Sequence, residues 1–494
     1  MENNQPDNKH KTAKKRGVKF SVYILSLLIV AGAAAGGTYA WIGRSVALPP
    51  TEEIIQGTNT STLDSAASEQ IGAVYQTLLN NYVEGVDKKV LIAGALKGMV
   101  ESVGDPYSQY LNTEASQNLD EKISASFEGI GAEIMSLDEK IVIVSPIKGS
   151  PAEKAGLLPN DVIVSADGQA LQGMTAQEAV NVIRGEKGTE VALEILRGDQ
   201  TIKVTIVRDT IPIETVTYEM DKAHPEIGVV HVSSFSTPTY DDIVSAVKDL
   251  RTQGATSFVF DFRQNPGGLL DQALKISNMF LKDGDVIMQT QEKDAEPNKI
   301  LASSKDFGDF KITEPTIVLV DEGSASASEI VAGALQESAK IPLVGTTTFG
   351  KGTVQTVYPL SENSELKLTV AKWLTPQGNW IHKKGIKVDY EVALPDYATL
   401  TIIDSTATYQ QGDVSENVKN VEKMLTAVGY PVNADGYYDE TTTSQVSAFQ
   451  QDNNLEVSGT VTGDTAVALV EKLRTIIAEN DTQYEKAIEL LTGK

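Results

Sequence analysis

The hydrophobic and polar positions change their period several times along the chain. Residues 20–43 carry no charged side chain, and a helix of that length spans roughly 36 Å, more than the hydrocarbon core of a bilayer at about 30 Å. From 68 to about 103, apolar residues recur at the i, i+3, i+4 and i+7 positions of a helix, up to a turn at 104–106. The pattern predicts a membrane-spanning helix followed, after a linker, by a helical region.

Two segments in the middle of the chain differ from each other in pattern. Residues 118–208 contain short alternating strands around one helical stretch, which predicts a small, strand-rich α+β domain. Between 226 and 395, apolar strand segments alternate with amphipathic helical segments. Such alternation is typical of an α/β core whose central strands are largely parallel.

The C-terminal part is predicted to be helical throughout. Residues 411–473 have helical periodicity with a weak internal repeat of 23 residues, and 474–494 form a single amphipathic pattern. These patterns predict a small all-α domain followed by one terminal helix.

Charge indicates on which side of a membrane the body of the protein lies. The first 19 residues hold six basic and two acidic side chains, whereas the whole chain has a formal charge of −25. Because Lys and Arg accumulate on the cytoplasmic side of membrane spans, we expect the N-terminus inside and the body outside. A cleaved signal peptide, with small residues at 38–40, is the alternative. We expect the acidic body to bind no nucleic acid.

Residue types that the sequence lacks exclude several kinds of site. There are no cysteines and only four histidines, and no two histidines have the spacing of metal ligands. Disulfides, cysteine nucleophiles and Cys- or His-rich zinc centres are therefore excluded. We expect neither a metal nor a cofactor.

A serine and a lysine follow two neighbouring predicted strands. Ser326 lies in the segment GSASASE, between an apolar strand and a helix. As local structure alone, Ser326 and Glu329 form a capping box. As chemistry, a serine at a helix N-terminus lies beside N–H groups that can stabilise an oxyanion. Lys351 ends the next strand in a Gly-flanked segment, where burial would favour a neutral amine that accepts the serine proton.

The lysine segment also matches part of a phosphate-binding motif. Residues 345–351 fit GxxxxGK, but Gly352 stands where Ser or Thr should follow. The next residues, 353–360, alternate as a strand does, whereas a phosphate-binding loop opens a helix. Nucleotide binding is therefore not expected.

A third predicted strand ends in the turn QNPGG. Either Pro and Gly serve only the geometry of a tight turn, or Gly267 or Gly268 brings a backbone N–H group to the reacting carbonyl. In the second case the N–H group of Ala327 would be the other donor of an oxyanion hole.

Four motifs together resemble those of one peptidase family. DFRQNPGGLL, DEGSASASEIVAGALQ, TFGKGTVQ and IHKKGIKVD, in this order, are similar to motifs of the carboxyl-terminal processing peptidases. The resemblance runs from about 68 to 395 and returns in the terminal helix. It implies a serine endopeptidase with a Ser–Lys dyad, a PDZ domain inserted before the catalytic core, and a homodimer.

The resemblance also implies roles for individual residues. Ser326 would be the nucleophile, Lys351 the general base, and Gln355, on the same face of a strand as Lys351, would orient the lysine. Ser324 and Ser328 are the rival nucleophiles. The family's spacing of 25 residues between the members of the dyad selects Ser326.

Two flanking modules have resemblances of their own. Gly129, Ile130 and Gly131, with SPAEKAGLLPNDVI farther on, resemble a PDZ domain whose loop binds a C-terminal carboxylate, so the partners would be proteins with free, apolar C-termini. Arg184 matches a family position that couples the PDZ domain to the active site, and a solvated surface charge is the alternative. Residues 411–473 resemble three-helix peptidoglycan-binding domains, which implies cell-wall peptidoglycan as a partner; a helical domain that packs on the protease is the alternative.

We therefore predict a multidomain α/β protein. Its parts are a cytoplasmic basic tail (1–19), a transmembrane anchor (20–43), a linker (44–65), an N-terminal helical region (66–117), a PDZ domain (118–208), a Ser–Lys protease core (209–400), a peptidoglycan-binding-like domain (411–473) and a C-terminal helix (474–494). The predicted function is that of a single-pass cell-membrane endopeptidase with its catalytic body on the extracellular side, cleaving proteins near their C-termini. The alternative is a catalytically silent scaffold of PDZ and wall-binding modules.

Overall fold

The computed structural model describes residues 64–361 and 364–493. The chain divides into two compact units, Met1–Ile92 and Ala93–Lys494. The predicted basic tail and transmembrane anchor lie outside the described residues. Among the helices that are described, none is long and apolar enough to cross a bilayer.

The predicted N-terminal helical region contains a break. Helix α3 (Ser65–Asn81) is capped by the Asp64 side chain, which accepts a hydrogen bond from the backbone N–H of Ala67, and α4 (Lys88–Glu101) follows after a turn. Several apolar side chains of the two helices are exposed: Ile71, Val74, Leu78, Val90, Ile92 and Met99. The apolar pattern therefore predicted helix correctly, although these side chains belong to no apolar core among residues 64–361 and 364–493.

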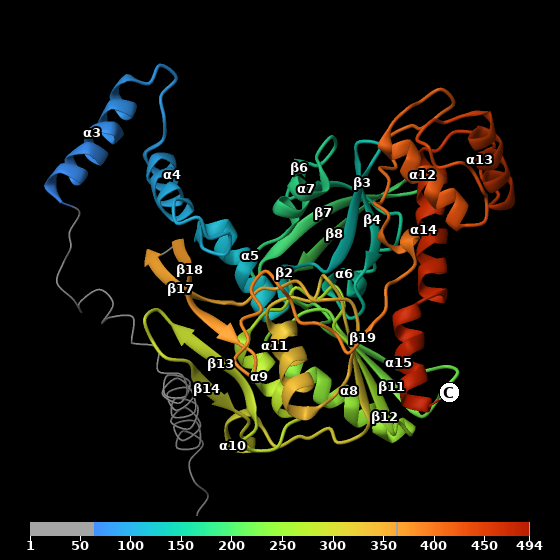
Figure 1. Ribbon diagram of the computed structural model, residues 1–494. Helices are drawn as coiled ribbons and strands as arrows, with labels where there is room; N and C mark the ends of the chain where they lie inside the picture. Colours follow the sequence, from blue (N-terminus) through green and yellow to red (C-terminus); the bar gives the residue numbers. More distant parts are fainter. Residues whose placement is uncertain (1–63, 362–363, 494) are drawn as a thin grey trace, which may run out of the picture. The chain divides into compact units, whose positions relative to one another are not determined.

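The α/β part of the second unit contains a six-stranded sheet, of which β11, β12 and β19 are labelled in Figure 1, in the order β10-β11-β12-β15-β16-β19. Its strands are β10 (Val216–Met220), β11 (Ile227–Val232), β12 (Ser257–Asp261), β15 (Thr316–Val320), β16 (Leu343–Gly345) and β19 (Tyr390–Glu391). Only β10 is antiparallel to its neighbour, and all the other pairs are parallel. This confirms the predicted α/β core with parallel central strands.

Helices cover both faces of this sheet. They are α8 (Thr239–Gln253), α9 (Leu270–Asn278), α11 (Ala327–Ala334) with its π-helical extension η1 (Leu335–Ala339), and α15 (Thr482–Thr492). Alternate strand residues point to opposite sides. Phe258 and Val318 pack with α8, α9 and α11 in the main core, whereas Val259 and Ile317 pack with Ala487 of α15. The terminal helix thus forms part of the α/β core.

A second sheet brings distant parts of the chain together. It has the order β1-β18-β13-β14, with β17 also paired to β18. Its strands are β1 (Gln109–Leu111), β13 (Val286–Glu292), β14 (Asn298–Leu301), β17 (Thr353–Ser361) and β18 (Ser364–Leu374), and short helix α10 (Ser304–Phe307) follows β14. Because β1 pairs with 365–367 of β18, the segment that precedes the PDZ region lies against the strands that follow the candidate lysine.

The predicted PDZ region forms a strand-rich module. Helix α5 (Thr113–Ser124) leads into β2 (Ser126–Gly129), which pairs with β9 (Asp209–Pro212). Between them lie β3 (Ala132–Leu137), β4 (Lys140–Pro146), α6 (Pro151–Lys154), β5 (Val162–Ala166), β6 (Gln169–Ala170), α7 (Ala176–Ile183), β7 (Glu190–Arg197) and β8 (Gln200–Val207). The β2–β9 pair joins the two ends of the module, which has a separate apolar core.

Three helices form the next module after the short helix η2 (Asp396–Thr399): α12 (Glu416–Ala427), α13 (Glu440–Asp452) and α14 (Gly463–Glu479). They enclose their own core, which includes Phe449, Leu469 and Leu473. Helix α14 continues past the expected boundary at 474, since Ile476 and Ile477 also pack against that core. The terminal pattern at 474–494 is therefore divided between α14 and α15.

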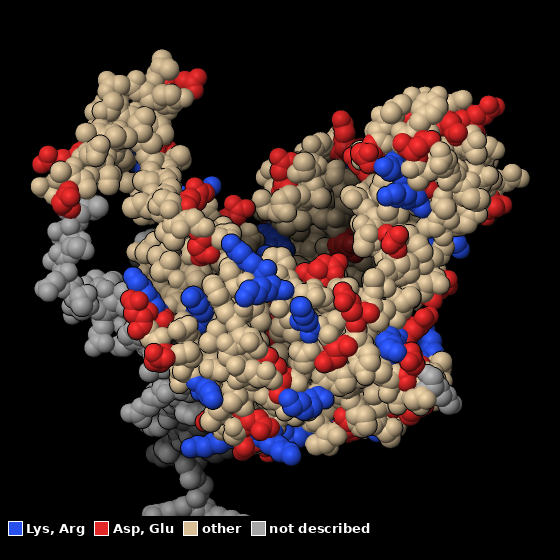
Figure 2. Space-filling model, in the orientation of Figure 1, with Lys and Arg blue, Asp and Glu red and all other residues tan. Residues whose placement is uncertain are grey.

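Charged side chains of both signs are scattered over the surface. On the face shown in Figure 2, uncharged residues make up most of the surface, with Asp and Glu and Lys and Arg among them. Over the whole sequence, Asp and Glu outnumber Lys and Arg by 67 to 42.

Candidate active site

Ser326 lies at the turn between β15 and α11, in a strained backbone conformation. Its φ is 55° and its ψ is −110°. Residues with a side chain rarely adopt a positive φ, at a cost on the order of 1–3 kcal/mol, and such strain clusters at functional turns. The residue is half-buried. With Glu329 it forms a capping box, in which its hydroxyl oxygen faces the backbone N–H of Glu329, and within the described part of the chain the hydroxyl donates no hydrogen bond.

The two rival serines have structural partners. Ser324 Oγ donates to the carbonyl of Phe262 at 2.8 Å and accepts from the N–H of Asp321 at 2.9 Å. Ser328 Oγ donates to the carbonyl of Asn265 at 2.8 Å. Both serines are fully buried. Of the three hydroxyl groups, that of Ser326 is the one left available for chemistry.

A buried carboxylate links the serine turn to the lysine segment. Glu329 is fully buried, and its two oxygens accept four hydrogen bonds of 2.6–2.8 Å. The donors are Ser326 N–H, Thr348 Oγ1, Gly350 N–H and Lys351 N–H. Four donors fill the acceptor sites of a carboxylate. Glu329 therefore fixes the main chain of both candidate catalytic residues relative to each other.

Lys351 lies just before β17, with its backbone held from both sides. Its N–H donates to Glu329 and its carbonyl accepts from Trp373 Nε1 at 2.8 Å. Nζ lies 5.1 Å from the centre of the Tyr107 ring. Burial, followed by the nearby charge of Lys367, lowers the pKa of Lys351 against the opposing charge of Glu329. A lowered pKa makes the neutral amine of a general base more accessible.

Gln355 does not reach the lysine. Its Nε2 donates to Thr353 Oγ1 at 3.0 Å and to Thr369 Oγ1 at 3.1 Å. The two residues were expected on one face of a strand. Lys351 lies outside β17, which begins at Thr353, and the register of β17 shifts just before Gln355. In the described residues, no hydrogen bond joins Lys351 Nζ to Ser326 Oγ either.

The QNPGG turn lies directly against the serine. A Cβ atom at Gly267 would lie 2.5 Å from the carbonyl oxygen of Ala325 and 2.8 Å from the nitrogen of Ala327, so only glycine fits. The Gly267 N–H already donates to Asn265 Oδ1 at 2.9 Å. In the part of the chain that is described, the N–H groups of Gly268 and Ala327 have no acceptor. These two amides are therefore free to bind an oxyanion.

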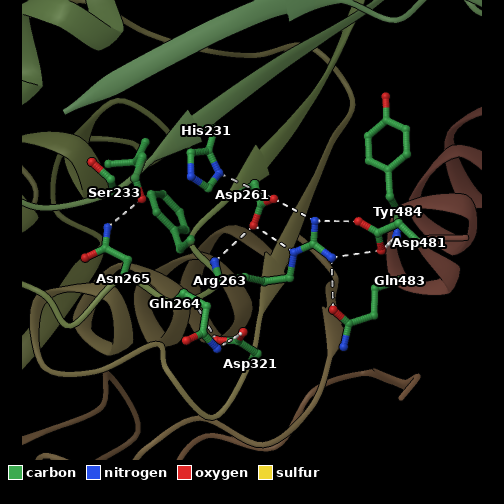
Figure 3. Close-up of polar contacts among 12 residues, drawn as sticks. His231, Ser233, Asp261, Arg263, Gln264, Asn265, Asp321, Asp481, Gln483 and Tyr484 are labelled. Carbon is green, nitrogen blue, oxygen red and sulfur yellow. Dashed lines mark hydrogen bonds and ion pairs between the residues drawn. The ribbon is translucent and has the colours of Figure 1, made fainter. Parts of the chain in front are cut away.

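A buried ionic cluster anchors the same turn to the terminal helix (Figure 3). Arg263 donates to both oxygens of Asp261 at 2.7–2.9 Å, to Asp481 at 2.8 Å and to Gln483 at 3.1 Å. Burial opposes ionisation of Asp261, but hydrogen bonds from His231 and Arg263 hold its pKa at about 2. Because Arg263 lies just ahead of the turn, α15 helps to position the strand end that carries the glycines.

The described residues contain no group of three or more His, Asp or Glu side chains arranged to hold a metal ion.

Comparisons with known proteins identify the family of this chain. The chain is 46% identical over 438 residues to "Carboxy-terminal processing protease CtpA" of Bacillus subtilis (strain 168), a match that covers 88% of this chain and 93% of that protein. The model of peptidase family S41 matches residues 226–392. The chain belongs to peptidase family S41.

Further matches concern relatives and flanking modules. A "Probable CtpA-like serine protease" of Staphylococcus epidermidis is 39% identical over 84% of this chain and 84% of its own length. The solved structure of a photosystem II D1 C-terminal processing protease is similar at 29% identity, with a TM-score of 0.39, over 66% of this chain and 88% of that one. Family models also match a PDZ domain (142–197), a peptidoglycan binding domain (414–469) and an activating protease CtpB N-terminal domain (29–115).

In this S41 peptidase, the loop at 129–131 lies between β2 and β3. Gly131 has a φ of 74°, and a Cβ atom there would lie 2.5 Å from that of Ser150, so any other residue would displace α6. Ile130 is buried in the PDZ core. At Gly129, a Cβ atom would make ordinary contacts, one of them with Arg184 Cγ at 3.6 Å.

Arg184 connects the PDZ module to the segment that precedes it. Its guanidinium donates to both oxygens of Glu121 on α5, at 2.8 and 2.9 Å, and lies over the Phe127 ring at 4.7 Å. Helix α5 in turn contacts β1 and β18. Arg184 is thus part of a contact between modules rather than a freely solvated charge.

Several residues of the site were missed at the level of sequence. Glu329 was visible only as one member of a capping box, Asn265 only as part of the QNPGG turn, and Tyr107 carried no motif that separated it from turn residues. Both Glu329 and Tyr107 lie close to Lys351. These contacts depend on the order of strands in two sheets, which local sequence patterns do not reveal.

Proposed function

We propose that this S41 peptidase is an endopeptidase that cleaves proteins near their C-termini, with Ser326 as nucleophile and Lys351 as general base. One observation carries the assignment. Ser326 has the only available hydroxyl of its motif, and one buried carboxylate, Glu329, holds its backbone together with that of Lys351. The names of the relatives, which are carboxy-terminal processing or serine proteases, support this substrate class.

The reaction follows from the positions of these groups. Neutral Lys351 accepts the proton of Ser326 Oγ as the oxygen attacks the scissile carbonyl, and the resulting ammonium returns the proton to the leaving amine. The free N–H groups of Gly268 and Ala327 stabilise the tetrahedral oxyanion. Gly267 serves close packing against the serine, since its own N–H is bound to Asn265.

The productive state requires side-chain movement. Lys351 Nζ has to leave the Tyr107 ring for Ser326, and Gln355 has to exchange Thr369 for the lysine if it is to orient that amine. We assign the described arrangement to the resting enzyme.

The PDZ module is proposed to bind the free, apolar C-terminus of the substrate. The N–H groups of 129–131 would receive the carboxylate, which forms stronger hydrogen bonds than an amide. Arg184 donates to Glu121 on α5, and α5 contacts β18. These contacts support the proposal that peptide binding to the PDZ module affects β18.

The location and assembly of the enzyme are also proposed. The uncharged stretch 20–43 behind a basic tail supports a single-pass anchor with the catalytic body outside. The peptidoglycan binding domain match supports retention at the cell wall. The exposed apolar side chains of α3 and α4 support a homodimer through the N-terminal helical region.

A pair of substrates tests this function. We would measure cleavage of an unfolded protein that ends in a free, apolar residue, and of the same protein with an amidated C-terminus. Wild type should cleave the free form on the order of ten- to a hundred-fold more efficiently. Arg184→Gln should reduce this preference, with Lys387→Gln, an exposed charge elsewhere, as the matched control.

Loss of activity in Ser326→Ala and in Lys351→Ala, with little further loss in the double variant, is expected because members of such a unit act together. Lys351→Ala turnover within a few-fold of wild type would refute the dyad. An enzyme inert towards every unfolded protein would favour the scaffold instead.

A further inference from the structure

The ring of Tyr107 is part of the active site, although it comes from the segment ahead of the PDZ module. Lys351 Nζ lies 5.1 Å from the ring centre, within the distance of about 6 Å at which a cation is attracted to the face of an aromatic ring. The contact joins the proposed general base to a residue 244 positions earlier in the chain.

A network of hydrogen bonds fixes the backbone that carries this ring. The N–H of Tyr107 donates to Asp105 Oδ1 at 3.2 Å, and Ser108 Oγ donates to Asp105 Oδ2 at 2.6 Å. Ser108 Oγ also accepts the N–H of Thr369 at 3.0 Å, and β1, which begins at Gln109, pairs with β18. The ring is therefore held against β18 rather than carried on a free loop.

An aromatic contact also packs against the ring. His382 lies edge-on to Tyr107, with ring centres 6.2 Å apart, and stacks on Trp380 at 5.2 Å. Trp380 Nε1 donates to the carbonyl of Gly352, next to the lysine. Tyr107 thus contacts both this aromatic stack and the Lys351 side chain.

From this geometry we propose that Tyr107 is a positioning residue for the general base: its ring face holds the Lys351 ammonium in the resting enzyme and sets the pH at which the neutral amine is released. The proposal rests on the assignment of Lys351 as the base. In the acid form the ammonium stays on the ring, and loss of its proton to solvent removes that attraction and frees the amine for Ser326.

Other charged groups also face the lysine, and their effects on its protonation must be distinguished from that of the ring. They are Lys367 on β18, Glu329 on α11 and Asp105 in the same segment as Tyr107. Burial and Lys367 favour the neutral amine, whereas Glu329 and Asp105 favour the ammonium. His382 lies edge-on to Tyr107, and Lys372 lies over the ring of Trp380, on which His382 stacks, at 4.4 Å. The ring adds to the groups that favour the ammonium, so weakening its π face should make Lys351 more acidic.

The test is to measure kcat/KM as a function of pH. The acid limb of this profile reports the pKa of the essential base in the free enzyme. We would compare Tyr107→Phe, which keeps the π face, with Tyr107→Leu, which removes it, and with trifluorophenylalanine at the same position, which keeps the shape but weakens the face. Phe should leave the limb in place. Leu and the fluorinated ring should move it to lower pH, by about half a unit to one unit.

Three comparisons make the result decisive. Tyr110→Leu, a half-buried neighbour on β1 without contact to Lys351, is the matched control and should not move the limb. His382→Asn should not move it either. The fluorinated enzyme keeps the test available if Tyr107→Leu fails to fold.

The proposal would be overturned if the acid limb of the fluorinated enzyme coincided with that of wild type. It would also be overturned if the acid limb moved in His382→Asn and in none of the Tyr107 variants. Wild type without any acid limb, or active Ser326→Ala, would instead refute the Ser–Lys assignment, so the two failures are distinguishable.

Discussion

Glu329 illustrates how one side chain can be local structure and catalytic support at once. The sequence predicted its hydrogen bond to the Ser326 backbone as part of a capping box, and that bond is present. The same carboxylate also binds Thr348, Gly350 and Lys351, which the sequence could not reveal because these residues follow the next strand. Local spacing predicts contacts within one turn of helix, whereas contacts between strand ends depend on sheet order.

We expect Glu329→Gln to reduce kcat/KM on the order of a hundred-fold and to lower the melting temperature. The amide would turn an NH2 group towards buried N–H donors and leave some of them unsatisfied, at about 1–3 kcal/mol each. Glu322→Gln, which affects an exposed carboxylate bonded to Thr346 Oγ1, is the matched control. A lower melting temperature with unchanged kcat/KM would show that Glu329 stabilises the fold without arranging the dyad.

Lys367 should affect the pH range of activity in the sense opposite to Tyr107. Its positive charge lowers the pKa of Lys351. Lys367→Gln removes that repulsion, so the pKa of Lys351 rises and the acid limb of kcat/KM moves to higher pH. Lys387→Gln, on the exposed surface, should leave the limb in place. A limb that stays fixed or moves to lower pH in Lys367→Gln would contradict this electrostatic account.

At the scale of elements, the sequence predicted the alternating strands and helices of the core, because apolar periodicity is a local property. It did not predict which faces they cover. The terminal amphipathic helix could have packed anywhere, and only the structure shows Ala487 against Val259 and Ile317. The pairing of β1 with β18 was likewise hidden, since a three-residue strand has too few positions to show a period.

The contact of α15 with the strand ends should be important for stability. Asp481→Asn would weaken a pair in which Arg263 is largely buried, and unpairing a buried charge costs about 3–5 kcal/mol at most. We expect a lower melting temperature and lower turnover together, because Arg263 lies just ahead of the glycine turn. Glu485→Gln on the exposed side of α15 is the control. Equal melting temperatures for Asp481→Asn and wild type would show that the cluster in Figure 3 contributes little.

At the scale of the whole molecule, the peptidoglycan binding module is inserted into the protease core. Before it, β19 completes the central sheet, and after it, α15 packs on that sheet. The two ends of the insertion lie together, since Gln483 Nε2 donates to the carbonyl of Val392 at 2.9 Å and Thr482 Oγ1 to that of Ala393 at 2.8 Å. The module has its own apolar core. It therefore resembles a domain inserted at a surface loop, which a fold tolerates losing.

This arrangement predicts that wall binding and catalysis can be separated, provided that α15 is kept. Replacing 404–479 with a flexible linker should abolish co-sedimentation with purified peptidoglycan and leave cleavage of a soluble unfolded protein within a few-fold of wild type. Truncation after 403, which also removes α15, should reduce both stability and turnover, because Val259 and Ile317 lose their cover and Arg263 loses Asp481. Undiminished sedimentation of the linker variant would place the wall contact elsewhere in the chain. Equal activity of the truncated and linker variants would instead show that α15 is dispensable to the active site.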